Sequence, residues 1–208
     1  YKSPLKKDIT FFYTDEVERQ TLLAISNEAE KRNYNIYFNN NLGDASEIGV
    51  YCSHNCGSFA QQSYFSIIML HDMAQRHDVW PNIWAHEPWD KFDIGILPGN
   101  EWFKRWEISQ KYPCANPRYG MYKLGWPKSD NIFRSYFKQE VEQLKNHLNL
   151  KYKQSVLYAP SWENDDKQDK FIQALKKLRI NLIIKQAPWS ENYPEILKNI
   201  KDMRDKHY

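Results

Sequence analysis

The sequence is poor in cysteine. Its 208 residues hold three cysteines, Cys52, Cys56 and Cys114, and no Cys-x-x-Cys pair. An odd number of scattered cysteines excludes a disulfide framework and the usual zinc motifs, and it indicates a reducing compartment. Cys52 and Cys56, with His54 between them, are the best candidate metal ligands, but their spacing is poor, so no metal site is expected.

Long hydrophobic runs and an excess of one charge are also missing. Lysine and arginine number 29 against 26 aspartates and glutamates, a formal net charge of +3, which is too small for a dedicated nucleic-acid-binding protein. No stretch reaches the roughly 18 apolar residues of a membrane-spanning helix, and no apolar secretory segment follows residues 1–7. A soluble, cytoplasmic protein is therefore expected.

Aromatic residues, by contrast, are abundant. The chain has 8 tryptophans and 14 tyrosines, many of them between Trp80 and Trp126. Aromatic rings with polar tips suit sugar platforms, wet interfaces and membrane-facing belts, but they suit a tryptophan-rich core equally well. Composition leaves both interpretations open.

Short β-rich runs alternate with segments of helical periodicity along the whole chain. This alternation predicts an α/β protein with a parallel sheet. Thr14 or Asp15 is expected to cap the first helix, Asn33 to end it, and Asn100 to cap the second. The expected strands are 9–13, 35–38, 48–52, 66–70, 92–97, 155–160 and 181–184, and the expected helices are 16–32, 101–112, 131–148, 167–178 and 194–207.

An irregular, proline- and glycine-punctuated stretch at residues 114–127 divides this pattern in two. We therefore expect one lobe over residues 1–126 and a second over 127–208. The second lobe offers only two strands, which cannot form a stable open sheet alone, so it is expected to be incomplete.

Residues 66–76 join an apolar run to a polar segment. The run Ser66–Leu70 predicts a buried parallel strand, and His71 and Asp72 follow it directly, with Arg76 close behind. Ligands of open α/β sheets bind beyond the carboxyl ends of strands, which makes His71 the candidate chemical centre. A histidine that only caps the strand is the alternative. Similar strand-end loops are expected at 160–163 and at 185–186.

Five segments in order resemble a known family. They read "IIMLHDMAQ", "WDKFDIGILPG", "GWPKSDNIF", "VLYAPSWEND" and "LIIKQAP". In order and rough spacing they are similar to the motifs of the CDP-glycerol glycerophosphotransferase family, which makes teichoic-acid and capsule polymers and has the glycosyltransferase-B fold of two Rossmann-like lobes. The resemblance implies that residues 1–126 form the acceptor-side lobe and residues 127–208 a partial donor-side lobe.

The resemblance also implies roles for single residues. His71 matches the family's proposed general base, and Asp72 could orient it. Lys185, with Arg76 or Lys128, would offset charge on a pyrophosphate. The remaining matches are Gly125, Pro127 and Asp130 in the inter-lobe turn and Tyr158, Ala159, Pro160 and Ser161 lining the donor cleft.

The reaction implied is the transfer of a polyol phosphate from a CDP-activated donor to a hydroxyl of a lipid-linked cell-wall or capsule polymer, with no cofactor and no nucleic acid. Peripheral contact at the inner membrane face through the amphipathic segment Ile196–Lys206 would follow, although a solvated helix also explains that segment. A sugar-nucleotide glycosyltransferase of the same fold and a non-catalytic glycan- or partner-binding module are the alternatives.

Three departures from the family pattern are visible. Asp72 stands where the family has glycine, and Ala187 where it has a second histidine. The family's downstream Asp-x-Ser-Ser element has no counterpart before Tyr208. These differences predict a truncated or divergent member.

Overall fold

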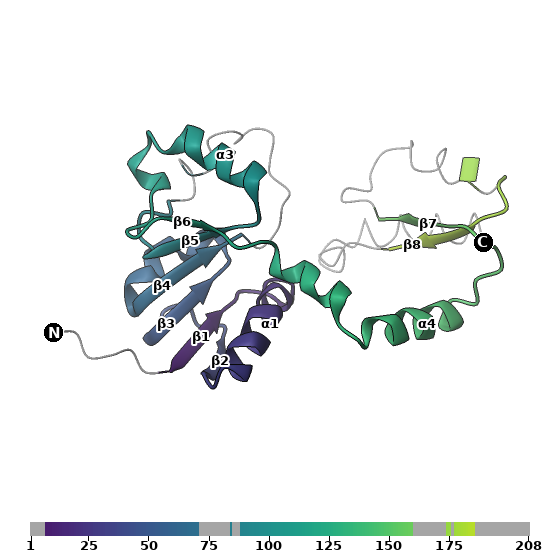
Figure 1. Cartoon of the computed structure of the whole chain (residues 1–208), viewed down its shortest axis with the longest axis horizontal. Coiled ribbons are helices and arrows are strands. Elements are labelled where there is room, and N and C mark those ends of the chain that lie inside the picture. Colours follow the sequence, from purple (N-terminus) through teal and green to yellow (C-terminus); the bar gives the residue numbers. More distant parts are fainter. Residues whose placement is uncertain (1–6, 71–83, 85–87, 160–173, 176, 186–208) are drawn as a thin grey trace. The chain divides into compact units, whose positions relative to one another are not determined.

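The structure, a computed structural model, describes residues 7–70, 84, 88–159, 174–175 and 177–185 (Figure 1). The chain forms two compact units, Tyr1–Phe137 and Lys138–Tyr208. The lobe boundary predicted after residue 126 lies ahead of this division, because residues Pro127–Phe133 pack against the first helix of the first unit.

The first unit is built on a six-stranded sheet in which every neighbouring pair is parallel. The strand order is β2-β1-β3-β4-β5-β6. The predicted α/β class with a Rossmann-like parallel sheet is therefore confirmed. The strands are β1 Asp8–Phe12, β2 Asn35–Asn39, β3 Ser46–Tyr51, β4 Ser63–Met69, β5 Ile94–Leu97 and β6 Met121–Lys123.

Both faces of this sheet bury apolar side chains. Phe11 and Phe12 are adjacent on β1 and fully buried, yet they belong to different core clusters, because successive strand residues point to opposite faces. Phe11 packs with Leu22 of the first helix, and Phe12 stacks on Tyr51 with ring centroids 4.7 Å apart. Burial on both faces explains why the strands read as continuous apolar runs.

The first helix, α1 (Glu16–Lys31), begins and ends as predicted. Asp15 is its N-cap and accepts a hydrogen bond from the backbone N–H of Glu18 at 2.9 Å. Asn33 follows the helix with φ 61°, the left-handed conformation that asparagine tolerates. The second helix, α3 (Asn100–Ser109), differs from the prediction, since Gly99 is its N-cap and Asn100 instead accepts from Lys123 Nζ at 3.1 Å.

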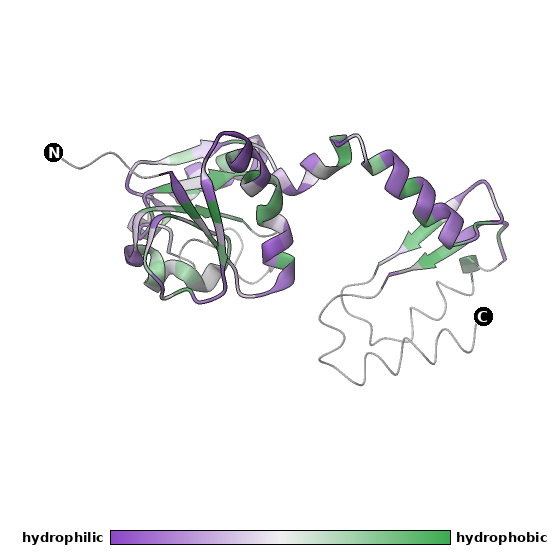
Figure 2. Cartoon of the chain, turned by 90° about the horizontal axis from the view of Figure 1, so that it is seen from below, coloured by the Kyte–Doolittle hydropathy of each residue, from purple (hydrophilic) through white to green (hydrophobic). Residues whose placement is uncertain are grey.

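Two predictions in the middle of the chain were wrong. Strand β6 was not expected, because its three residues are too short to show alternation, and pairing with β5 forms it. The single helix expected at 131–148 is two elements, a 3-10 helix η3 (Pro127–Phe133) and α4 (Phe137–His147). α4 carries both hydrophilic and hydrophobic residues (Figure 2), but none of them is buried. Two further 3-10 helices are η1 (His54–Gln62) and η2 (Pro113–Ala115).

The described tryptophans belong mainly to the core. Trp84, Trp89 and Trp102 are buried, and Trp84 meets the other two edge to face at centroid distances of 5.9 and 6.4 Å. Trp106 packs beside them and donates its indole N–H to the Ala115 carbonyl at 2.8 Å. For these residues the core interpretation is confirmed and the sugar-platform interpretation is wrong.

The second unit contains a two-stranded parallel sheet of β7 (Ser155–Tyr158) and β8 (Asn181–Ile184). The nearly buried Asn181 side chain forms hydrogen bonds with the backbone of the segment that precedes β7. It accepts from the backbone N–H groups of Lys151 and Tyr152 at 2.8 and 2.9 Å, and it donates to the Tyr152 carbonyl at 2.7 Å. Both predicted strands of this lobe are present.

Candidate functional site

The strand order of the large sheet reverses at one point. The chain passes from β1 to β2 on one side and returns to β3 on the other, so β1 and β3 are neighbours at the reversal. Ligands of open α/β sheets bind in the crevice beyond the carboxyl ends of such strands. The segments that leave this edge are Tyr13–Asp15 after β1 and Cys52–Ser53 after β3.

β4 ends at the same edge. Its last residue is Met69, and the buried Leu70 follows. His71, Asp72 and Arg76 lie outside the described residues, so their roles stay predictions.

Gly125, Pro127 and Asp130, which were predicted to form an inter-lobe turn, follow β6 inside the first unit. Gly125 has φ +93°, a left-handed conformation that favours glycine, and a side chain there would meet no neighbouring atom. Pro127 begins η3 and Asp130 lies three residues further on. The structure therefore brings these three predicted residues together in one turn that packs against α1.

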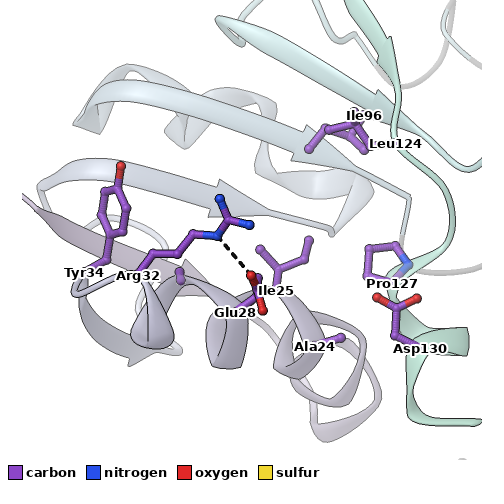
Figure 3. A pocket seen from close by; sticks show the side chains of 10 residues that line it. Ala24, Ile25, Glu28, Arg32, Tyr34, Ile96, Leu124, Pro127 and Asp130 are labelled. Carbon is purple, nitrogen blue, oxygen red and sulfur yellow. Dashed lines mark hydrogen bonds and ion pairs between the residues drawn. The ribbon is translucent and has the colours of Figure 1, made fainter. Parts of the chain in front are cut away.

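Pro127 and Asp130 also line a groove of about 360 Å³ beside α1 (Figure 3). Its apolar lining comes from α1, β5 and the turn after β6. At the far end, Glu28 and Arg32 form an ion pair at 2.9 Å, with 53% and 71% of their side chains exposed. The other lining residues are Ala24, Ile25, Ala29, Tyr34, Ile96 and Leu124.

In the second unit, two predicted residues meet at the carboxyl ends of β7 and β8. The Lys185 backbone N–H donates to the Tyr158 carbonyl at 2.9 Å. Tyr158 is half-buried and Lys185 is exposed, so the lysine side chain is accessible to an anionic ligand. Pro160 and Ser161 lie outside the described residues.

A buried carboxylate, that of Glu18, lies at the switch point and was not predicted from the sequence. Glu18 is only 5% exposed, and one of its carboxylate oxygens accepts from the Thr14 backbone N–H at 2.7 Å and from the Thr14 hydroxyl at 2.8 Å. The signal that could have found it is the spacing Asp15-x-x-Glu18, a variant of the helix capping box.

The cysteines close to this edge are structural. Burial raises the pKa of the Cys52 thiol above its ordinary value, and the neighbouring Glu18 carboxylate adds to the rise. Burial likewise raises the pKa of Cys56 to about 11. Metal ligation needs the thiolate, which burial disfavours here. Within the described ranges, no group of three or more histidine, cysteine, aspartate or glutamate residues could hold a metal ion.

The six-stranded parallel sheet and its helices are consistent with a Rossmann-like α/β fold of glycosyltransferase type. Residues 100–195 match the sequence model of a transferase family, CDP-Glycerol:Poly(glycerophosphate) glycerophosphotransferase. The family predicted from the ordered motifs is thereby confirmed over that range. No curated protein and no solved structure gave a match.

The matched range covers only part of the predicted site. It includes the inter-lobe turn, the 158–161 segment and Lys185. His71, Asp72 and Arg76 precede it, so their assignment depends on the motif resemblance and on the position of β4.

Proposed function

We propose that this protein transfers a polyol phosphate, such as glycerol phosphate, from a CDP-activated donor to a hydroxyl of a lipid-linked polymer. The observation that carries the proposal is the match of residues 100–195 to a family that uses CDP-glycerol. The parallel sheet of the first unit supports it, because β4, which precedes His71, and β6, which precedes Gly125, end at the same edge of that sheet.

In the proposed reaction, the acceptor hydroxyl oxygen attacks the β-phosphorus of the donor. A new oxygen–phosphorus bond forms, the bond to the bridging oxygen breaks, and CMP leaves. His71 takes the proton of the attacking hydroxyl, a role that suits an imidazole near neutral pH. Asp72 orients the ring, and Lys185, with Arg76 or Lys128, offsets the pyrophosphate charge.

The half-buried Lys128 and the exposed Lys185 fit the electrostatic part of this scheme. Neither lysine appears in an ion pair between described residues. Gly125, Pro127, Asp130, Tyr158, Pro160 and Ser161 are proposed as further substrate-binding residues.

The test is CMP release from CDP-glycerol with a short glycerol phosphate oligomer as acceptor. The wild-type protein should turn over, and His71→Ala should lower the rate at least about a hundredfold, the smaller end of what a general base contributes. His147→Ala is the matched control, since His147 is exposed at the end of α4. Normal turnover in His71→Ala would remove the base assignment.

Two other outcomes identify the alternatives. Release of nucleotide from a nucleotide sugar, but not from CDP-glycerol, would mark a glycosyltransferase of the same fold. No turnover with any donor, together with retained binding of the acceptor oligomer, would mark a non-catalytic binding module.

Membrane contact belongs to the same proposal. No helix in the described part of the chain is long and apolar enough to cross a bilayer. Contact at the inner face would therefore be peripheral, through Ile196–Lys206, which lies outside the described residues. Co-sedimentation with anionic vesicles that exceeds co-sedimentation with neutral vesicles is expected, and equal amounts would contradict the contact.

A further inference from the structure

Helix α4 leaves a narrow row of apolar side chains unburied. Hydrophobic residues recur along this helix among mostly hydrophilic ones (Figure 2). The row consists of Phe137, Val141, Leu144 and Leu148; none of them is buried, and Leu144 is 56% exposed. Leu148 directly follows α4, but its backbone N–H still donates to the Leu144 carbonyl at 2.9 Å, so the last helical turn includes it. Successive spacings of four, three and four residues place the four side chains on one side of the helix.

This row has the pattern of a coiled-coil seam. A helix that packs on a globular core usually has an apolar face at least about 100° wide, whereas a coiled coil uses only positions a and d of a heptad lettered a to g. Phe137 and Leu144 take the d positions, and Val141 and Leu148 take the a positions. A β-branched residue at a with leucine at d favours two strands, and Val141 with Leu144 meets that preference. The side away from the seam is polar and consists of Gln139, Glu142, Gln143 and Asn146.

The charges beside the seam complement those of a second copy in parallel orientation. Lys138 and Lys145 take the e positions, Glu140 takes the g position, and all three are exposed. In a parallel pair, the g residue of one helix faces the e residue five positions later on the other. Glu140 would therefore face the partner's Lys145, and two-fold symmetry would repeat the ion pair on the other side of the seam. An antiparallel pair would set Lys138 against the partner's Lys145, which are like charges.

Both members of this ion pair are accessible in the single chain. Glu140 takes part in no ion pair between described residues. Lys145 Nζ lies 2.7 Å from the exposed Glu142 of its own helix. An ammonium group has three donors, so Lys145 can keep this contact and also bind the partner's Glu140. With two lysines and two glutamates, α4 has no net charge that would draw it to an anionic membrane instead.

We propose that α4 is a dimerisation helix, on which two copies of the chain pair in parallel through the apolar row and through reciprocal ion pairs between Glu140 and Lys145. The seam is only about three turns long, so it buries less area than a standard interface. The dimer should therefore be weak and depend on protein concentration. The inference concerns α4 alone and does not rest on the proposed function.

The test is sedimentation equilibrium of the full chain over a concentration series up to about 500 μM at low salt. The wild type should show a monomer–dimer equilibrium. Leu144→Ala removes a seam side chain from both copies and should raise the Kd at least about tenfold. Gln143→Ala changes the polar side of the same turn and is the matched control, with a Kd within about twofold of wild type. A wild type that stays monomeric, or a dimer that Leu144→Ala leaves unchanged, overturns the proposal.

Exchanging the charges tests the parallel orientation. Glu140→Lys and Lys145→Glu should each raise the Kd about fivefold, because each variant alone places like charges together twice in the dimer. An equimolar mixture of the two variants restores opposite charges at both positions and should dimerise as strongly as the wild type. A mixture no tighter than the single variants overturns the ion pairs. A tighter dimer in Lys145→Glu alone overturns the parallel orientation, because an antiparallel pair would gain an attraction to Lys138.

Thermal unfolding of the same samples separates dimerisation from folding. Since no side chain of α4 is buried, the monomeric variants should melt at the temperature of the monomeric wild type. A lower melting temperature of Leu144→Ala, at concentrations where the wild type is monomeric, would show that the row packs within its own chain. That result overturns the proposal.

Discussion

The buried Asp93 carboxylate allows a quantitative prediction of stability. Asp93 is 6% exposed at the amino edge of the sheet, just before β5. One of its oxygens accepts from the Ser66 backbone N–H at 2.8 Å and from the Ser66 hydroxyl at 3.2 Å. The other accepts from Arg118 Nη1 at 3.0 Å, and the Arg118 side chain is 64% exposed. Asp93 therefore ties β4, β5 and the turn before β6 together.

The hydrogen bonds to Ser66 and the ion pair with Arg118 should contribute different amounts to the free energy of unfolding. Asp93→Ala leaves the buried Ser66 N–H without its carboxylate partner and removes all three hydrogen bonds that the carboxylate accepts, for a loss of about 3 kcal/mol. Asp93→Asn keeps one acceptor for Ser66 and should lose about 1–2 kcal/mol. Arg118→Gln should lose only about 0.5–1 kcal/mol, because the guanidinium is mostly in solvent and its attraction is screened.

Urea unfolding followed by tryptophan fluorescence measures these changes, since Trp84, Trp89 and Trp102 report on the core of the same unit. The expected order of midpoints is wild type, Arg118→Gln, Asp93→Asn, Asp93→Ala. If Arg118→Gln destabilises the unit as much as Asp93→Ala, the exposed ion pair dominates and the reasoning from burial is refuted.

Two further predictions concern backbone conformation and pH. Gly125→Ala should cost about 1–2 kcal/mol from the left-handed conformation alone, whereas Gly99→Ala should be nearly neutral in the same urea assay, because Gly99 is extended and has open space around it. Burial raises the pKa of Tyr51 to about 12. Since the unfolded tyrosine loses its proton near pH 10, the stabilising effect present below pH 10 is lost as pH rises toward 12, about 1.4 kcal/mol by pH 11. Tyr51→Phe should show a smaller loss between pH 9 and pH 11, and an equal loss in both proteins would contradict this assignment.

The first unit was predictable from sequence where local signals and burial agree. The cap at Asp15, the left-handed Asn33 and the apolar strand runs each have a local physical cause, so α1 and five of the strands could be placed. β6 could not, because Met121–Lys123 forms a strand only through its partner. The helix expected from residue 131 failed for a related reason: η3 packs against α1, and the helical periodicity of the sequence does not show that contact.

The candidate site was predictable as an ordered set of motifs but not as a geometry. Motif order identifies which loops leave the carboxyl ends of strands, and Tyr158 and Lys185 do meet there. It does not show strand order, so the switch point between β1 and β3 was not predicted. The Asp93 of the "WDKFD" motif also illustrates the limit, because its contacts with Ser66 and Arg118 make it a structural residue far from the carboxyl edge.

Charged side chains of both signs lie near the ends of the strands. The N-terminus of α1 presents Asp15, Glu16 and Glu18, and the Asp15 carboxylate accepts from the Glu18 N–H, so this end of the helix differs from the phosphate-binding helix ends typical of dinucleotide sites. A donor with two phosphates would meet repulsion there. The predicted cationic contacts are Lys128, half-buried on η3 where that helix packs against α1, and Lys185, exposed after β8. Lys128 and Lys185 therefore remain the predicted contacts of the pyrophosphate.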